Sequence, residues 1–432
     1  MPMDFDQVPH LITADTGPLH YLERHIVENH LKIEGWLREQ WQQFPPPLHS
    51  SVDLRNAAFK LAPVDTNLFP AGFNNLNRDF IPLCIQATQS TLQQRYPHLS
   101  KILLVSESHT RNPNYYLSLA TLHEIISKAG YEVRIGTLRD VLTTAETIAL
   151  ENGQSIVVEP IQRQNNTLHL ENFVPELIWL NNDLAEGIPK ILENLDQPVT
   201  PPLKLGWAHR YKSNHFKYYE AICNEFSELI QMDPWLINPA FRHCGEINFL
   251  KREGTECLTK NADLLFKTIQ RKYNEYRIDQ KPFLVIKADT GTYGMGVMTI
   301  QSTEELLSLN RKQRTHMSHS KGRQAINRVI MQEGVYTFET WDQAIAEPVV
   351  YMLGAHVVGG FYRVHKNRGI TENLNAPGMQ FEPLAFAEPC NNPDPCCDTP
   401  SGTHRFYAYG VVARLALLAA AREVYYSQEE HA

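Results

Sequence analysis

The sequence predicts an α/β protein of two or three structural units, and three observations support this fold class. The chain has 432 residues, which is too long for one ordinary hydrophobic core. Residues 101–137 follow the order strand, helix, strand, which is the pattern of a parallel sheet. From residue 281 onward, strand-like segments and glycines dominate, up to an Ala/Leu-rich helix around 405–425. We therefore expect an N-terminal parallel-sheet (Rossmann-like) domain followed by a strand-rich C-terminal domain.

Composition and charge exclude several classes of protein. Hydrophobic residues make up 43% of the chain and charged residues 20%, which is typical of a globular protein. The net charge of -8 argues against a nucleic-acid partner, because such proteins carry a basic excess or stripe. Residues 1–10 lack the apolar core of a signal peptide, and the apolar run 411–421 is too short to span a membrane. We expect a cytoplasmic protein, and a homo-oligomer is compatible with the sequence.

Cysteine usage agrees with a reducing compartment. The chain has seven cysteines, an odd number, and free thiols are the default in the cytoplasm. Cys390, Cys396 and Cys397, with His404 nearby, have two interpretations, a zinc site and a surface loop. The cluster lacks the C-x-x-C spacing that zinc usually favours, so we expect a Pro/Asn-rich loop.

The N-terminal segment predicts a helix and then a binding loop. Residues 17–43 show apolar residues at helical spacing, and a triple proline at 45–47 ends the helix. Residues 51–80 show neither helical nor strand periodicity and mix apolar anchors with many hydrogen-bonding side chains. This mixture indicates a packed loop that binds a ligand. The alternative is an irregular connection whose Asn and Asp residues only form turns.

Two further polar segments are candidates for ligand binding. The segment 101–112 predicts a buried strand that ends in a polar loop with Ser106, Glu107, Ser108, His109 and Arg111. Ligands of parallel sheets bind beyond the carboxyl ends of strands. After an expected linker at 197–203, residues 209–217 carry the densest group of His, Lys and Arg in the chain. Such a patch can hold a carboxylate or a phosphate, although a solvated helix start would have the same composition.

The glycine-rich stretch 291–296 lies between two strand-like segments and begins four residues after Lys287. A P-loop needs G-x-x-x-x-G-K-[ST], which does not occur, and a Rossmann fingerprint needs G-x-G-x-x-G before a helix. The observed spacing, G-x-x-G-x-G before a strand, argues against a dinucleotide-binding oxidoreductase. A strand, a glycine loop and a second strand form a hairpin lid, whose backbone N–H groups approach phosphate oxygens closely. The ammonium of Lys287 would neutralise part of the phosphate charge.

Later segments complete the features of a nucleotide site. The segment 328–335 predicts an apolar strand that runs into residues 332–335, which suit an adenine pocket and a carboxylate that takes ribose hydroxyls. Residues 347–378 predict two strands with a turn near Gly354, an arginine at position 363 and an Asn/Pro/Gly loop. Lysine, glycine lid, hinge carboxylate, arginine and asparagine loop follow one another in this order.

This order resembles that of the ATP-grasp ligases, and "YRVHKNRGITENLNAPG" is similar to a stretch of glutathione synthetases. "SVDLRNAAFKLAPVDTNLFPAGFNNL", "SESHTRN", "GWAHRYKSNHF" and "IKADTGTYGMGVM" resemble the proteobacterial glutamate–cysteine ligase (gamma-glutamylcysteine synthetase) family over nearly the whole chain. The resemblance implies ATP-dependent joining of the glutamate γ-carboxylate to the cysteine amine through a γ-glutamyl phosphate, with Mg²⁺ or Mn²⁺. It also implies that Lys287 and Arg363 are catalytic.

The resemblance assigns the remaining site residues by position. The residues expected to bind ATP are Lys287, Gly291, Thr292, Tyr293, Gly294, Gly296, Gln332, Glu333 and Val335. Cationic and amide groups must meet the substrate carboxylates, and the candidates are Arg55, Lys60, Asn67, Asn74, Asn75, Arg111 and Arg210. Related ligases hold the metal with a C-terminal Glu-x-Asn pair that this chain lacks, so the candidate ligands are Glu347, Glu372, Asn373 and Asn375.

The expected domain organisation has three parts, and two rival functions stay open. We expect an α/β substrate domain at 1–200, a largely helical connecting subdomain at 204–280 and an ATP-grasp-like catalytic domain at 281–432. The near rival is a glutathione synthetase-like or other carboxylate–amine ligase, which would share the ATP site. The far rival is a non-catalytic nucleotide-binding regulator, which could have lost any of the catalytic residues.

Overall fold

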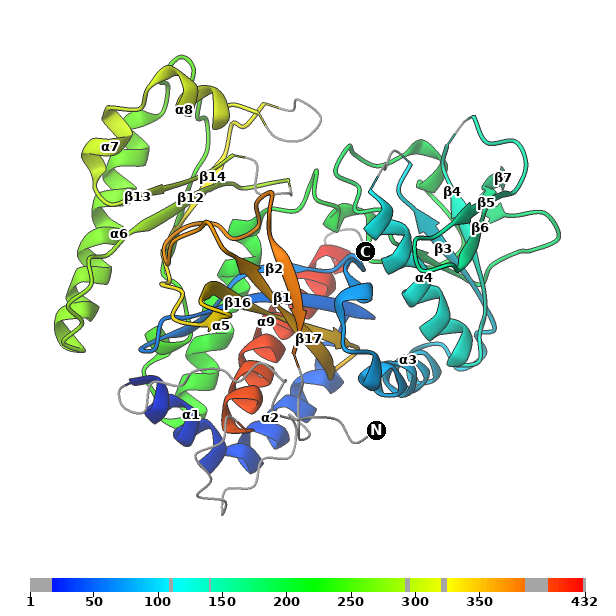
Figure 1. The fold of residues 1–432 in the computed structure, drawn as a ribbon, viewed down its shortest axis with the longest axis horizontal. Helices are drawn as coiled ribbons and strands as arrows, with labels where there is room; N and C mark the ends of the chain where they lie inside the picture. Colours follow the sequence, from blue (N-terminus) through cyan, green and yellow to red (C-terminus); the bar gives the residue numbers. More distant parts are fainter. Residues whose placement is uncertain are drawn as a thin grey trace.

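The computed structural model describes residues 18–108, 112–139, 141–291, 296–319, 325–384 and 403–429. Figure 1 shows a central sheet with helices behind it, a second sheet on the right and a third sheet with its own helices on the upper left. The mixed α/β class predicted from the sequence is confirmed.

The central sheet joins segments from both ends of the chain (Figure 1). Its strands lie in the order β18-β17-β16-β1-β2, with β15 paired to β16, and all pairs are antiparallel. Their bounds are β1 His49–Asn56, β2 Leu61–Asn67, β15 Thr340–Trp341, β16 Ala344–Leu353, β17 His356–His365 and β18 Gln380–Pro383. The apolar helix α9 (Thr403–Glu429) packs against one face of this sheet and against α5 (Lys212–Ile230).

Strand β1 shows how the sequence sets the two faces of this sheet. Side chains alternate along a strand, so Val52 and Leu54 enter the core beside α9, whereas Asp53 and Arg55 point to the opposite face. The expectation of an irregular loop at 51–80 is therefore wrong for residues 51–67. The alternation lasts only a few residues, a β-bulge interrupts it between Asp53 and Leu54, and Pro63 weakens the signal of β2.

The second sheet has the order β10-β9-β3-β4-β6-β5, and only its edge strand β5 pairs antiparallel among the described strands. The bounds are β3 Lys101–Ser106, β4 Glu132–Thr137, β5 Glu146–Ala149, β6 Ser155–Pro160, β9 Leu177–Leu180 and β10 Val199–Thr200. Helix α4 (Pro113–Lys128) connects β3 to β4 and packs on α3 (Ile81–Arg95), which confirms the predicted strand–helix–strand unit. The expectation of a linker at 197–203 is wrong where β10 extends the sheet. A hairpin of β7 (Gln162–Gln164) and β8 (Thr167–His169) lies outside it.

The third sheet is antiparallel, with the order β11-β14-β12-β13. Its strands are β11 Phe241–Cys244, β12 Leu284–Ala288, β13 Val297–Ile300 and β14 Val329–Glu333. Helix α6 (Thr255–Glu275) packs against it, with α7 (Thr303–Leu307) and α8 (Arg311–His316) at its end (Figure 1). Strands β12 and β13 form the predicted hairpin, in which Lys287 is opposite Val297.

Other expectations have mixed outcomes. The predicted helix at 17–43 is interrupted at Asn29, which separates α1 (Pro18–Glu28) from α2 (His30–Gln43). The four described cysteines are free thiols, whereas Cys390, Cys396 and Cys397 lie outside the described residues. Within the described ranges, no helix has the length and apolar character needed to cross a bilayer. The three-part domain division stays a prediction, although β1 and β2 share a sheet with β16 and β17.

Candidate functional site

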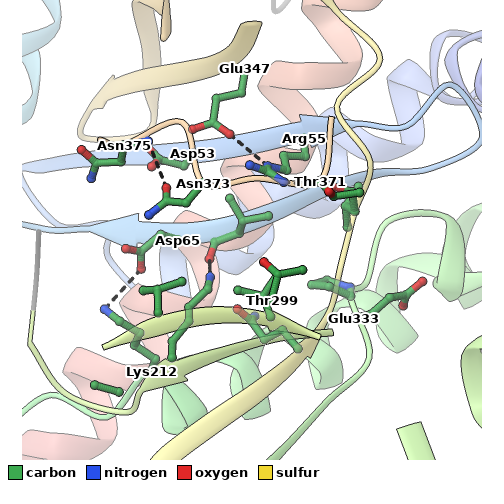
Figure 2. Close-up of a pocket in the computed structure, with 18 of the residues that line it drawn as sticks. Asp53, Arg55, Asp65, Lys212, Thr299, Glu333, Glu347, Thr371, Asn373 and Asn375 are labelled. Carbon is green, nitrogen blue, oxygen red and sulfur yellow. Dashed lines mark hydrogen bonds and ion pairs between the residues drawn. The ribbon is translucent and has the colours of Figure 1, made fainter. Parts of the chain in front are cut away.

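One pocket lies between the polar face of the central sheet and the third sheet, and it encloses about 950 Å³ including its solvent-open part. Figure 2 shows side chains from both sheets converging on it. Strands β1, β2, β16 and β17 supply one wall, and β12, β13 and β14 supply the other. Ten of the residues selected from the sequence line this pocket: Arg55, Lys287, Gly291, Gln332, Glu333, Val335, Glu347, Arg363, Asn373 and Asn375.

The central-sheet wall carries an alternating network of charges. Glu347 accepts hydrogen bonds from Arg55 Nε at 2.9 Å and from Arg363 Nη1 at 2.6 Å. Arg363 Nη1 also donates to Asp53 Oδ2 at 2.7 Å. Burial acts to raise the pKa of Glu347, but the two guanidinium groups outweigh it and hold that pKa below its usual value. Glu347 therefore stays ionised and orients both arginines.

A second charged group lies where the two sheets meet. Lys287 Nζ donates to the carbonyl oxygen of Val64 at 2.7 Å, and burial lowers the pKa of the lysine to about 8. Lys212 Nζ lies 3.6 Å from Asp65 Oδ1 and 3.8 Å from the centre of the Trp207 ring. Within the described ranges, this buried ammonium makes no hydrogen bond. Burial lowers the pKa of Lys212, and such a cation is suited to bind an anion.

A buried carboxylate fixes Lys212 relative to the lysine of β12. Asp289 directly follows β12 and is fully buried. Its carboxylate accepts hydrogen bonds from the Ser213 backbone N–H and hydroxyl, both at 2.7 Å, and from Arg328 Nε at 2.5 Å. Asp289 thus caps the N-terminus of α5, where Lys212 lies.

The C-terminal end of β14 forms the far end of the pocket. The side-chain amide of Gln332 is buried, and neither its nitrogen nor its oxygen makes a hydrogen bond within the described residues. A buried donor and acceptor without partners fit the edge of a heterocyclic base. Glu333 differs from expectation, because its carboxylate accepts hydrogen bonds from Lys60 Nζ at 2.7 Å and from Trp235 Nε1 at 3.1 Å. Glu333 lines the pocket, and these contacts hold its carboxylate in place. Its role as a ribose ligand stays a prediction.

The glycine lid is described only at its ends. Gly291 and Gly296 both have positive φ angles, 88° and 64°, which favour glycine. The backbone N–H of Gly291 donates to the carbonyl oxygen of Trp207 at 2.7 Å, so the base of the lid contacts the segment that precedes Lys212. Thr292, Tyr293 and Gly294 lie outside the described residues.

Several expected substrate ligands do not reach the pocket. Lys60 is held by Glu333, and Arg210 binds Glu423 Oε2 at 2.8 Å and the carbonyl oxygen of Thr66 at 2.6 Å. The Asn67 side chain bonds the backbone of Phe69. Asn74 and Asn75 lie on the 3-10 helix Phe73–Asn75, which packs on α4, and bond each other. Arg111 and His109 lie outside the described residues.

The expected metal ligands do not form a ready cation site. Both oxygens of Glu347 accept hydrogen bonds from arginines. The Glu372 carboxylate accepts hydrogen bonds from Arg368 Nη1 and from the Gly369 N–H. Asn373 Oδ1 accepts from the Asn375 N–H at 2.9 Å. Among the described residues, no group of three or more His, Cys, Asp or Glu side chains could hold a metal ion. The set therefore does not fit a preformed divalent-cation site.

Sequence reasoning missed several residues that line the pocket: Asp53, Asp65, Lys212, Thr290, Thr299 and Thr371. Figure 2 places Asp53 and Asp65 on the two paired strands of the central sheet. The alternation of Asp53 with Val52 and Leu54 was a usable signal. Lys212 belongs to the basic patch at 209–217, but only the turn before α5 determines that it, and not Arg210, faces the pocket.

Comparison with known proteins gives a consistent result. A family model described as glutamate-cysteine ligase matches residues 23–424. The crystal structure of a candidate gamma-glutamylcysteine synthetase from Methylobacillus flagellatus KT is 53% identical, with a TM-score of 0.90, and the match covers 97% of this chain and 99% of that chain. A comparison with curated proteins found no match.

Two further solved structures show much weaker similarity. The glutathione synthetase-like effector GSS30 from Globodera pallida is 10% identical, with a TM-score of 0.37, covering 85% of this chain and 80% of that one. D-alanyl-alanine synthetase A from Vibrio cholerae O1 biovar eltor str. N16961 is 8% identical, with a TM-score of 0.33, covering 73% and 81%. TM-scores this low do not support a conclusion about fold or function.

Proposed function

The chain belongs to the glutamate–cysteine ligase family, and from this premise we propose that the pocket between the two antiparallel sheets is its active site. The enzyme joins the γ-carboxylate of glutamate to the amine of cysteine. A carboxylate is a poor electrophile, so we propose that ATP first converts it to γ-glutamyl phosphate, with ADP as the product. The placement of ATP between two sheets corresponds to the ATP-grasp arrangement.

The single observation that supports this placement best is the distribution of groups along the pocket. The unpartnered amide of Gln332 lies at one end and would meet the adenine edge. Lys287 and the N-terminal end of the glycine lid lie further along β12 and would meet the phosphates. Arg363, on the opposite sheet, would face the phosphoryl group as it is transferred.

The charged side chains that line the pocket indicate how a metal ion would be bound there. Four carboxylates and four cations line the pocket: Asp53, Asp65, Glu333 and Glu347, with Arg55, Lys212, Lys287 and Arg363. Among the described residues these eight charges cancel, and Lys60, which pairs with Glu333 from outside the pocket, adds one positive charge. This is less than the negative charge of ATP, which therefore needs a further cation. A divalent ion would arrive bound to the ATP phosphates, since such ions are often held chiefly by substrate phosphates.

The first step is transfer of the γ-phosphoryl group. A glutamate γ-carboxylate oxygen attacks the γ-phosphorus, and ADP leaves with the electron pair of the P–O bond. Lys287 and Arg363 stabilise the negative charge that spreads over the transferred group, and Glu347 holds Arg363 in place without reorganisation. The lid would exclude water, which would otherwise hydrolyse the acyl phosphate.

The second step forms the amide bond. The cysteine amine attacks the acyl carbon, and the tetrahedral intermediate collapses with loss of phosphate. Arg55 lies beside Arg363 on the same face, bridged by Glu347. Its Nη1 and Nη2 also donate to the carbonyl oxygens of Val335 and Glu372, so one N–H on each of these two nitrogens would meet a substrate carboxylate.

Product analysis tests the proposed reaction. Purified protein is mixed with ATP, Mg²⁺ and glutamate, with and without cysteine, and phosphate release and product mass are measured. The expected result is cysteine-dependent release with γ-glutamylcysteine as the product. Release only with γ-glutamylcysteine and glycine would assign the second enzyme of the pathway, and ATP binding without release for any pair would indicate a non-catalytic regulator.

The pKa of Lys287 gives a prediction about pH. With a pKa of about 8, Lys287 is charged below pH 8 and loses its charge as the pH rises above 8. Bound ATP favours the charged form, so binding above pH 8 must also protonate the lysine. We expect the KM for ATP to rise by up to about tenfold per pH unit above pH 8. In Lys287→Arg, whose guanidinium stays charged, the KM should be flat over the same range, and an equal rise in both proteins would contradict this role.

A further inference from the structure

Two aspartates lie directly opposite each other on the pocket face of the central sheet. Asp53 on β1 pairs in register with Asp65 on β2. Like charges at opposed positions of antiparallel strands destabilise a sheet. Of the four carboxylates that line the pocket, these two are the exposed ones, with 21% and 40% of the side chain accessible against 3% for Glu347 and 1% for Glu333. Arg363 and Lys212 offset this repulsion, each paired with one of the two aspartates. Both carboxylates face the pocket space, which points to a role with the ligands.

The chemistry of the ligands indicates which group a carboxylate would serve. ATP and the glutamate side chain are anionic, so an exposed carboxylate repels them. The α-ammonium of glutamate would attract a carboxylate, but it takes no part in the reaction. The cysteine amine arrives as an ammonium and must lose a proton before it can attack. We propose that Asp53 is the general base that takes this proton, an inference that rests on the ligase reaction proposed above.

The surroundings of Asp53 place it at the reacting carbon. Its Oδ2 accepts from Arg363 Nη1 at 2.7 Å, and Arg363 is the residue expected to hold the transferred phosphoryl group. An amine that attacks the acyl carbon next to that phosphoryl group lies beside Asp53. The bond from Arg363 uses Oδ2, which leaves Oδ1 of Asp53 to accept a proton.

The proton and electron balance of the step is complete. The ammonium of cysteine gives one proton to Asp53, and the neutral amine forms a C–N bond to the acyl carbon. The C–O bond to the phosphoryl group then breaks, and phosphate leaves with its electron pair and with the second proton of the nitrogen. The carboxylic acid of Asp53 releases its proton to solvent after the product departs.

Other carboxylates of the pocket are less suited to this task. Both oxygens of Glu347 and of Glu333 are engaged with buried donors. Asp65 faces Lys212 and Lys287, which outweigh the effect of burial and hold its pKa below the usual value. Burial also raises the pKa of Asp53, but there the opposing charge of Arg363 does not outweigh it, and the charges of Glu347 and Asp65 add to the rise. A carboxylate with a raised pKa is a better base.

Hydroxylamine, used as the nucleophile in place of cysteine, tests the general base separately from the other catalytic groups. It is largely unprotonated at neutral pH, so it attacks γ-glutamyl phosphate without a base and gives γ-glutamyl hydroxamate, which iron(III) detects by colour. In Asp53→Asn we expect ligation of cysteine to fall about 100-fold or more, while hydroxamate formation stays within about fivefold of the wild type. Asp65→Asn is the matched control, because loss of a carboxylate that faces the lysines should slow both nucleophiles by a similar factor.

The outcomes distinguish this inference from the proposed function. An equal loss of both products in Asp53→Asn would assign Asp53 to the positioning of Arg363 and overturn the base, and unchanged ligation of cysteine would overturn it as well. If Asp53→Asn does not fold, Asp53→Glu keeps the carboxylate and should restore the ratio of the two rates to within about tenfold of the wild type. A wild-type enzyme that forms neither product would refute the ligase reaction itself.

Discussion

Replacing Arg363 by lysine is expected to lower kcat by about a thousandfold while the KM for ATP changes little. The guanidinium of Arg363 lies between two carboxylates, at 2.7 Å from Asp53 and 2.6 Å from Glu347, and both outweigh the effect of burial to raise its pKa. Nη1 alone donates to both carboxylates, which leaves the other N–H groups of the guanidinium for the phosphoryl group. A lysine keeps the charge, but its one nitrogen cannot hold the carboxylates and reach the phosphoryl group at the same time. Steady-state kinetics with ATP, glutamate and cysteine measures the effect.

A matched control separates the loss of the guanidinium geometry from a general effect of the substitution. Arg422 forms an ion pair with Glu225 away from the pocket, and Arg422→Lys should leave kcat within about twofold of the wild type. Thermal unfolding of Arg363→Lys checks that the protein is folded at the assay temperature. A kcat for Arg363→Lys within tenfold of the wild type would show that Arg363 does not stabilise the transferred group.

Lys60→Met is expected to lower the free energy of unfolding by about 3–5 kcal/mol. Lys60 and Glu333 form an ion pair at 2.7 Å with 1% of each side chain exposed, and Lys60 Nζ also lies 4.2 Å from the centre of the Trp235 ring. Removal of the ammonium leaves the Glu333 carboxylate charged and buried without its counter-ion. Denaturant unfolding of the wild type and the variant measures the difference.

The same substitution tests whether Lys60 binds a substrate, as the sequence suggested. Because Lys60 does not line the pocket, the KM values for glutamate and cysteine should stay within about twofold of the wild type in the folded variant. Lys267→Met removes an exposed lysine, 72% accessible, from its pair with Asp263 and should cost less than about 1 kcal/mol. The double variant Lys60→Met/Glu333→Gln, which lacks the unpaired buried carboxylate as well, should be more stable than Lys60→Met alone. A large rise in the KM for glutamate would show that Lys60 binds this substrate.

The parts of the fold that could be predicted from the sequence are those set by local pattern. The strand–helix–strand unit at 101–137, the lid hairpin around Lys287 and the hairpin with its turn near Gly354 all follow from periodicity and glycine placement. The pairing of β1 with β16 could not be predicted in this way, because it joins segments nearly 300 residues apart in the chain.

The candidate site likewise contains residues that local sequence pattern could predict and residues that it could not. Lys287, Gln332 and Arg363 lie in segments with a recognisable pattern, and the pocket brings them together. Asp53 lies in a strand whose short alternation is a weak signal, because a bulge interrupts it. Lys212 is the first residue of a helix, and only the assembled fold defines which way it faces. The ion pairs of Glu333 and Arg210 could not be predicted from the sequence either. Their partners, Lys60 and Glu423, come from distant segments and engage the charges that the sequence assigned to ligands.

Transfer of an oxygen isotope tests the central claim, that this pocket activates glutamate as an acyl phosphate. Glutamate labelled with ¹⁸O in its γ-carboxylate is converted with ATP and cysteine, and the released phosphate is analysed by mass. Passage through γ-glutamyl phosphate places one ¹⁸O atom of the glutamate in each inorganic phosphate. Phosphate that contains no ¹⁸O, or label found in AMP, would contradict the acyl phosphate and the assignment of Lys287 and Arg363 to its formation.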